Sequence, residues 1–175
     1  MKTIVLGPQP LEITAFLARR RALGQDRSDE VWEGEYHVVP APHPMHGQVD
    51  SEVAALLRPA AKAAGLVITT QFNLGTADDY RVPDDGYHRA PPPDVWVPTA
   101  AIVVEIVSPG DETWAKFDFY ARHYVDEVCI ADPPRREVRW FLLKGRVYEE
   151  APASLLLGVK AADLAARIDW PQPQD

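Results

Sequence analysis

The chain has 175 residues, a net charge of −8 from 18 basic and 26 acidic side chains, and a hydrophobic fraction of 46%. This length and composition are typical of a globular domain and exclude a disordered chain or a repeat array. The acidic balance disfavours a protein that coats nucleic acid through its overall charge. It leaves room for a site in which carboxylates bind a metal and basic contacts are local.

We expect a single domain over residues 1–170 and a flexible, proline-rich tail over residues 171–175. The single cysteine, Cys129, lies in an apolar run and is predicted to be a buried core residue, which favours a reducing, cytoplasmic location. The apolar run from Thr3 to Leu6 is too short for a signal peptide. No stretch approaches the roughly 20 apolar residues of a membrane span, so we expect no membrane partner.

The first half of the chain alternates between helical and extended patterns. Apolar residues at helical spacing predict helices over residues 11–23 and 46–64. Between them, the alternation over residues 31–39 predicts two short strands that turn at Gly34. A strand over residues 66–70 follows, and a polar stretch over 76–80 then turns the chain into an extended segment that begins at residues 81–84.

The second half contains the clearest strand, residues 101–107, which is nearly all apolar and should be buried on both faces. Residues 108–111 resemble a capping box and predict a helix with a buried stripe. The members of that predicted stripe are Trp114, Phe117, Ala121 and Tyr124. The remaining predicted elements are a strand at 127–131, a hairpin of 137–143 with 146–149, and a helix at 161–168. This order predicts an α/β domain with a mixed central sheet flanked by helices.

Glu105 stands inside the most apolar strand, in the run Ala-Ile-Val-Val-Glu-Ile-Val. A buried carboxylate without a partner costs several kcal/mol or stays protonated. Glu105 therefore needs a salt bridge, a strong hydrogen-bond donor or a metal ion. Asp84, which follows Pro83 in an extended segment 21 residues upstream, can supply a second carboxylate.

Two converging carboxylates can hold a hard divalent cation such as magnesium, with manganese as the alternative ion. Lys116, on the predicted helix after the Glu105 strand, can direct an ammonium into the same pocket. Two other aspartates compete with Asp84 for the metal. Asp85 adjoins it in a turn-like Pro-Asp-Asp-Gly, and Asp94 follows three prolines 11 residues before Glu105.

Pro83-Asp84 followed by Glu105-Ile106-Val107 is similar to the PD-(D/E)XK nuclease signature. A longer ordered series resembles the Uma-two family of restriction-endonuclease-like bacterial proteins and covers about residues 10–150. The matching pieces are Glu33-Gly34-Glu35, Pro40 to Pro42, His46, Arg81 to Asp84, Ile102 to Pro109, Lys116 to Tyr120 and Val125 to Pro133.

The resemblance implies a restriction-endonuclease-like fold and a homodimer. It also implies metal binding by Asp84, Glu105 and the backbone carbonyl of Ile106, with Glu35 as another acid near the metal. The general signature places a lysine two residues after the acid, where this chain has Val107. In the Uma-two pattern the lysine comes from the following helix, so Lys116 is the natural substitute, although the loop before it is short.

These residues together predict a magnesium-dependent endonuclease in which an activated water hydrolyses DNA phosphodiester bonds. The acidic charge and Val107 leave open an inactive nuclease fold that serves as a binding or assembly module. A glycosidase with paired acids is a third interpretation. His37, His43 and His46 lie close in sequence, but their spacing matches no common zinc pattern. His46 opens a helix and could face the pocket.

Overall fold

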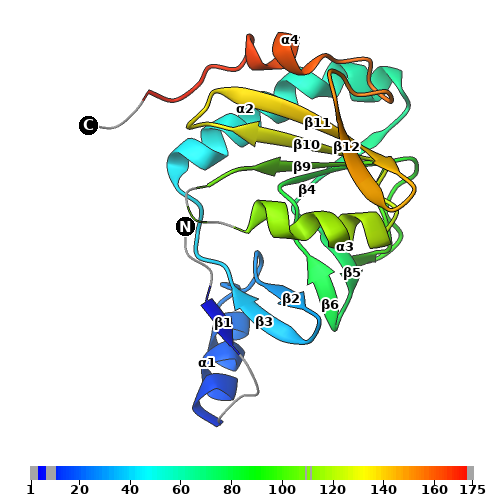
Figure 1. Cartoon of the computed structure of the whole chain (residues 1–175). Helices are drawn as coiled ribbons and strands as arrows, with labels where there is room; N and C mark the ends of the chain where they lie inside the picture. Colours follow the sequence, from blue (N-terminus) through cyan, green and yellow to red (C-terminus); the bar gives the residue numbers. More distant parts are fainter. Residues whose placement is uncertain (1–3, 7–10, 109, 111, 173–175) are drawn as a thin grey trace.

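The computed structural model describes residues 4–6, 11–108, 110 and 112–172 (Figure 1). Its described strands form two mixed sheets, here called the outer and the central sheet. The outer sheet has the order β1 (Ile4–Leu6), β3 (Glu35–Val38), β2 (Glu30–Trp32), β6 (Asp79–Arg81), β5 (Asn73–Thr76) and β8 (Trp96–Val97). The central sheet has the order β12 (Val147–Ala151), β11 (Glu137–Lys144), β10 (Glu127–Asp132), β9 (Ile102–Ile106), β7 (Asp85–His88) and β4 (Val67–Thr70).

The helices of the described chain are α1 (Leu11–Ala22), α2 (Pro44–Ala63), the short 3-10 helix η1 (Thr113–Lys116), α3 (Phe117–Arg122) and α4 (Ala161–Ala165). The predicted α/β class, with a mixed sheet flanked by helices, is confirmed. The sequence did not indicate that the strands would divide into two sheets.

The central sheet is covered on both faces (Figure 1). On one face, α2 presents the fully buried Val49, Val53 and Leu57, and α4 adds Leu164. On the other face, α3 packs Phe119 against the sheet. The strand β9 lies between, parallel to β10 and antiparallel to β7, and all its residues are buried. The prediction of a central strand buried on both faces is confirmed.

The segment after β9 differs from the prediction of one helix opened by residues 108–111. Pro109 and Asp111 lie outside the described residues, and the chain forms η1 before α3. The predicted buried stripe is wrong for Trp114 and Tyr124, which are 42% and 66% exposed. It is confirmed for Ala121, which is buried, and Phe117 is partly buried against the core. A 3-10 turn has fewer residues per turn than an α-helix, so it shifts the phase of the side chains. The residues of α3 that become buried are Phe119, Tyr120 and Ala121.

One long hairpin passes through both sheets. Its arms pair as β4 with β7 in the central sheet and as β5 with β6 in the outer sheet, in the same register on both sides. The arms bend between the sheets at residues 71–72 and 82–84. Gln71 lies at this bend with a φ of +32°, and its backbone N–H donates to the Asp84 carbonyl oxygen at 2.9 Å. The bend therefore places Asp84 at the junction of the two sheets.

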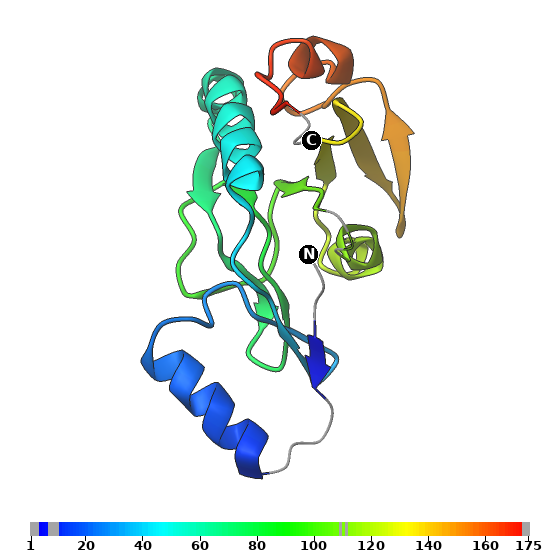
Figure 2. The same ribbon diagram turned by 90° about the vertical axis from the view of Figure 1, so that its left-hand side faces the viewer.

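The helix α1 lies apart from the central sheet, beside the outer sheet (Figure 2). Its bounds agree with the predicted helix over residues 11–23. Phe16 on α1 and Leu23 just beyond it are 48% and 60% exposed. None of the helices in the described part of the chain is long and apolar enough to span a membrane.

Candidate active site

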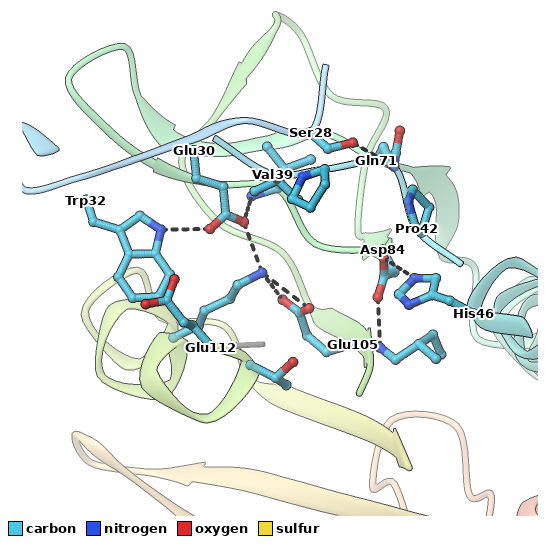
Figure 3. A pocket seen from close by; sticks show the side chains of 15 residues that line it. Ser28, Glu30, Trp32, Val39, Pro42, His46, Gln71, Asp84, Glu105 and Glu112 are labelled. Carbon is cyan, nitrogen blue, oxygen red and sulfur yellow. Dashed lines mark hydrogen bonds and ion pairs between the residues drawn. The ribbon is translucent and has the colours of Figure 1, made fainter. Parts of the chain in front are cut away.

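A small cavity of about 90 Å³ opens at the junction of the two sheets (Figure 3). Five charged side chains line it. They are Glu30 on β2, Asp84 in the connection from β6 to β7, Glu105 on β9, Glu112 just before η1 and Lys116 at the end of η1. Three of these are the acid and base residues that the sequence predicted, so the fold gathers Asp84, Glu105 and Lys116 in one place.

The Lys116 ammonium lies between two carboxylates. Its Nζ is 2.9 Å from Glu30 Oε1, 3.1 Å from Glu105 Oε1 and 3.3 Å from Glu105 Oε2. Burial disfavours the charged ammonium, but the negative charges of Glu105 and Glu30 outweigh burial and raise the pKa of Lys116. Lys116 is therefore a permanent cation here, and the short loop before it does not prevent it from reaching Glu105.

Glu105 is 3% exposed, and its carboxylate also accepts a hydrogen bond from the Tyr120 hydroxyl. Burial raises the pKa of Glu105, although the Lys116 ammonium acts in the opposite direction. Two hydrogen-bond donors thus hold the carboxylate in place, while burial of its negative charge still costs free energy. A second cation in the cavity would favour the ionised form of Glu105.

Asp84 is held from two sides. Its Oδ2 accepts the Ile106 backbone N–H at 2.8 Å, and its Oδ1 lies 2.9 Å from His46 Nε2. The other ring nitrogen of His46 lies 3.0 Å from the Ser108 hydroxyl. Burial lowers the pKa of His46, but its hydrogen bond to Asp84 and the Asp84 charge outweigh burial, so that the pKa is raised. His46 therefore does face the pocket.

The two rival aspartates lie elsewhere. Asp85 is fully buried on β7 and does not line the cavity. Asp94 is exposed in the segment before β8, and its Oδ1 accepts the backbone N–H of Val95 at 2.6 Å. Of the three candidates that the sequence left open, the structure brings only Asp84 beside Glu105 and Lys116.

Glu30 and Glu112 also line the cavity, and the sequence reasoning missed both. Glu30 is the one that contacts Lys116. Its Oε1 accepts the Val82 backbone N–H at 2.8 Å, and its Oε2 accepts Trp32 Nε1 at 2.7 Å. Glu35, the acid expected from the resemblance, is exposed at the start of β3 and does not line the cavity. The turn at Gly34 reverses the chain, so acids on the two arms need not share a face. Glu30 and Trp32 are two residues apart on β2, so their side chains lie on the same face of the strand. This spacing could have indicated that Glu30 points to the same side as the tryptophan.

The donor set can be compared with the needs of particular metals. Magnesium binds through one or two carboxylates and keeps several waters, so Asp84 and Glu105 fit it, with the backbone of Ile106 at the same cavity. Among the described residues, no cluster of three or more His, Cys, Asp and Glu side chains is arranged to hold an ion. His37 lies 3.2 Å from Glu112 and His43 caps α2, so neither joins His46.

The fold resembles a solved structure. The crystal structure titled a "putative nuclease belonging to DUF820" from Anabaena variabilis ATCC 29413 matches with a TM-score of 0.65 and 16% sequence identity, over 80% of this chain and 90% of that one. At this identity the match shows a shared fold. No curated protein matches the sequence. The Uma2 family profile, described as "Putative restriction endonuclease", matches residues 15–166, which is most of the chain. The chain therefore belongs to the Uma2 family.

Proposed function

We propose that this protein is a metal-dependent endonuclease that hydrolyses DNA phosphodiester bonds, with magnesium as the ion and manganese as its substitute. The observation that carries the proposal is the Lys116 ammonium between Glu30 and Glu105, with Asp84 beside them. Two carboxylates that could bind a metal ion, with a lysine beside them, are groups that metal-assisted phosphoryl transfer uses. The fold and the membership in a family described as restriction endonucleases support the same assignment.

In this proposal, Asp84, Glu105 and the Ile106 carbonyl would hold the ion. The ion would lower the pKa of a bound water and offset the negative charge of the phosphate. Lys116 orients the attacking water and stabilises charge that develops on the phosphate oxygens. Water adds at phosphorus, the bond to one ester oxygen breaks, and that oxygen takes up a proton. The products are a phosphomonoester and an alcohol.

The remaining contacts position these groups. Glu30 holds Lys116 and, through the Val82 N–H, the segment that carries Asp84. Tyr120 fixes the Glu105 carboxylate, and His46 fixes that of Asp84. Removing residues that hold a metal ligand in place commonly lowers metal affinity or activity by about 10- to 100-fold.

The test is cleavage of supercoiled and linear DNA by the purified protein with magnesium or manganese. We expect Glu105→Ala to reduce cutting to background and Lys116→Ala to reduce it by about 10²- to 10³-fold, as for loss of a group that stabilises transition-state charge. Glu30→Gln should reduce it more than Glu35→Gln. The matched control is Glu149→Ala, an exposed glutamate on β12. Cleavage that survives both EDTA and Glu105→Ala would contradict the mechanism.

A second candidate function is a binding or assembly module on an inactive nuclease fold. It is favoured by the pairing of both carboxylates with groups of the protein itself, Glu105 with the Lys116 ammonium and Asp84 with the His46 ring. Isothermal titration with magnesium and manganese separates the two candidates. Heat of binding that disappears in Glu105→Ala supports the nuclease, whereas no heat with either ion supports the module.

A further inference from the structure

Two larger hollows adjoin the small cavity of Glu30, Asp84, Glu105 and Lys116, here called the acid cavity, at Gln71. One, of about 740 Å³, lies between Arg27 and the strands β5 and β8. The other, of about 490 Å³, lies between the end of α1 and residues 39–42. Gln71 lines all three, and Arg27 lines both of the larger ones. We call the larger two together the flanking groove. A ligand that occupied both the acid cavity and this groove would therefore pass Gln71.

Gln71 is a strained residue at this passage. Its φ of +32° lies in the left-handed region, which residues other than glycine rarely occupy. Its backbone is tied to the Asp84 carbonyl and its side-chain amide donates to the Ser28 hydroxyl at 3.2 Å. Figure 3 places Gln71 and Ser28 next to Asp84, on the side of the cavity away from Glu112. Residues held in sparsely populated conformations cluster at ligand sites.

The part of the flanking groove of about 740 Å³ offers aromatic surface. Phe72, Tyr80 and Trp96 line it and are half-buried, and the Tyr80 and Trp96 rings meet edge to face with centroids 4.9 Å apart. Arg27 is exposed at its rim. The other charges are partly compensated locally, since Arg21 Nε lies 3.6 Å from Asp26 and Asp94 accepts the Val95 N–H.

These features match one kind of ligand. Aromatic side chains stack on nucleobases of any sequence, and a nearby arginine binds the intervening phosphate. The bases of an intact duplex are already stacked and paired, so they cannot reach such a surface. A strand whose bases are unpaired can reach it.

We propose that the flanking groove binds unpaired nucleotides of the DNA strand whose phosphate lies in the acid cavity. The substrate class is then single-stranded DNA, or duplex with an overhang or flap, in preference to intact duplex. This inference rests on the proposed nuclease function for the placement of the phosphate. Arg27 contacts the backbone, the aromatic residues contact the bases, and Gln71 lies between the two sites.

The charge distribution makes a further distinction. With one or two arginines on the phosphates, the affinity for single strands should depend weakly on salt, with a slope of about −0.7 per phosphate contact on a log–log plot. A protein that held duplex DNA through many phosphate contacts would show a much steeper dependence.

The experiment measures binding without cleavage. Fluorescence anisotropy of the wild-type protein in EDTA is recorded with a labelled single-stranded oligothymidylate and with a blunt duplex of the same length. We expect the single strand to bind at least about 10-fold more tightly, because each stacked base contributes roughly a 5- to 150-fold gain. Trp96→Leu and Arg27→Glu should each weaken binding of the single strand by about 10-fold.

Two matched variants serve as controls. Trp114→Leu removes another part-exposed tryptophan, which lies on η1, and Arg146→Glu reverses another exposed arginine, in the β11–β12 turn. Neither lines the groove, and binding should change less than twofold. If Trp96→Leu fails to fold by circular dichroism, the exposed Arg27→Glu decides. Equal or tighter binding of the duplex, or equal losses in the controls, would overturn the proposal.

Binding and cleavage can fail separately. If the protein binds single strands through Arg27 and Trp96 but cuts no DNA with magnesium or manganese, the proposed nuclease function is wrong and the proposed binding groove is supported. If the protein cuts duplex DNA and neither Arg27→Glu nor Trp96→Leu has an effect, the proposed binding groove is wrong and the proposed nuclease function is supported.

Discussion

At the scale of single residues, the site depends on charges that are expensive to bury. Glu105 and Glu30 are 3% exposed, and each would cost several kcal/mol as an unpaired carboxylate. Lys116 offsets both charges, while Tyr120, Trp32 and the Val82 N–H satisfy the remaining carboxylate oxygens. Removing one member of such a group leaves the others buried and unpaired. The site should therefore tolerate isosteric substitutions better than truncations.

His88 on β7, another buried titratable residue, allows a test of stability that does not depend on catalysis. It is 4% exposed, and its Nε2 lies 2.9 Å from the Thr69 hydroxyl. Burial lowers the pKa of His88 below its ordinary value, so the folded state binds a proton less readily than the unfolded state. Its stabilising effect is complete above the ordinary histidine pKa of about 6.5 and is lost as the pH falls through that value toward the lower folded pKa.

We therefore expect wild-type protein to lose more unfolding free energy between pH 7.5 and pH 5 than His88→Gln, which cannot ionise. Urea denaturation at the two pH values measures the difference, and all other titrating groups are common to both proteins. Equal losses in the two proteins would show that His88 does not contribute to the pH dependence.

At the scale of elements, the bent hairpin from β4 to β7 is the feature that connects the sheets and positions Asp84. The bend leaves space for the Phe72 ring only because residue 86 has no side chain. A Cβ at Gly86 would lie 2.2 Å from Phe72 Cε1 and 2.8 Å from His88 Nε2. Phe72 also lines the flanking groove, so packing of the hairpin and shape of the groove are linked.

Gly86→Ala should therefore destabilise the protein by about 1–3 kcal/mol through overpacking. The matched control is Gly47→Ala in α2, where a Cβ would meet nothing within 4 Å. That substitution should stabilise the protein by roughly 0.5–1 kcal/mol, because alanine favours a helix more than glycine does. Chemical denaturation of both variants checks the pair. The interpretation is wrong if Gly86→Ala is as stable as wild type.

At the scale of the whole molecule, α1 leaves apolar surface uncovered. Phe16 and Leu23 are separated by two helical turns, so they lie on one side of this segment, and both are exposed. We expect a homodimer that covers this side. The expectation comes from the family resemblance and from the uncovered side chains.

Analytical ultracentrifugation at micromolar concentration should give a dimer for wild type and a monomer for the double variant Phe16→Glu, Leu23→Glu. Leu155→Glu is the control, because Leu155 is 72% exposed in the segment after β12 and should leave the dimer intact. A wild-type protein that sediments as a monomer, or a double variant that stays dimeric, would refute an interface through α1.

The sequence by itself determined the elements with strong local signals. The apolar run around Glu105, the helical spacing of Val49, Val53 and Leu57, and the hairpin around Gly145 were sufficient to predict β9, α2 and the β11–β12 hairpin. The cost of burying a carboxylate in that apolar run also indicated Glu105 as a site residue, and the family resemblance directed attention to Asp84 and Lys116.

Only the tertiary structure decided which residues meet. Glu30 reaches Lys116 because two sheets join at the bent hairpin, and no local pattern encodes a contact between residues 86 positions apart. The same long-range arrangement leaves Glu35 outside the cavity and places the flanking groove beside it at Gln71. Periodicity reports which side of an element is buried, but the partner across that surface depends on the fold.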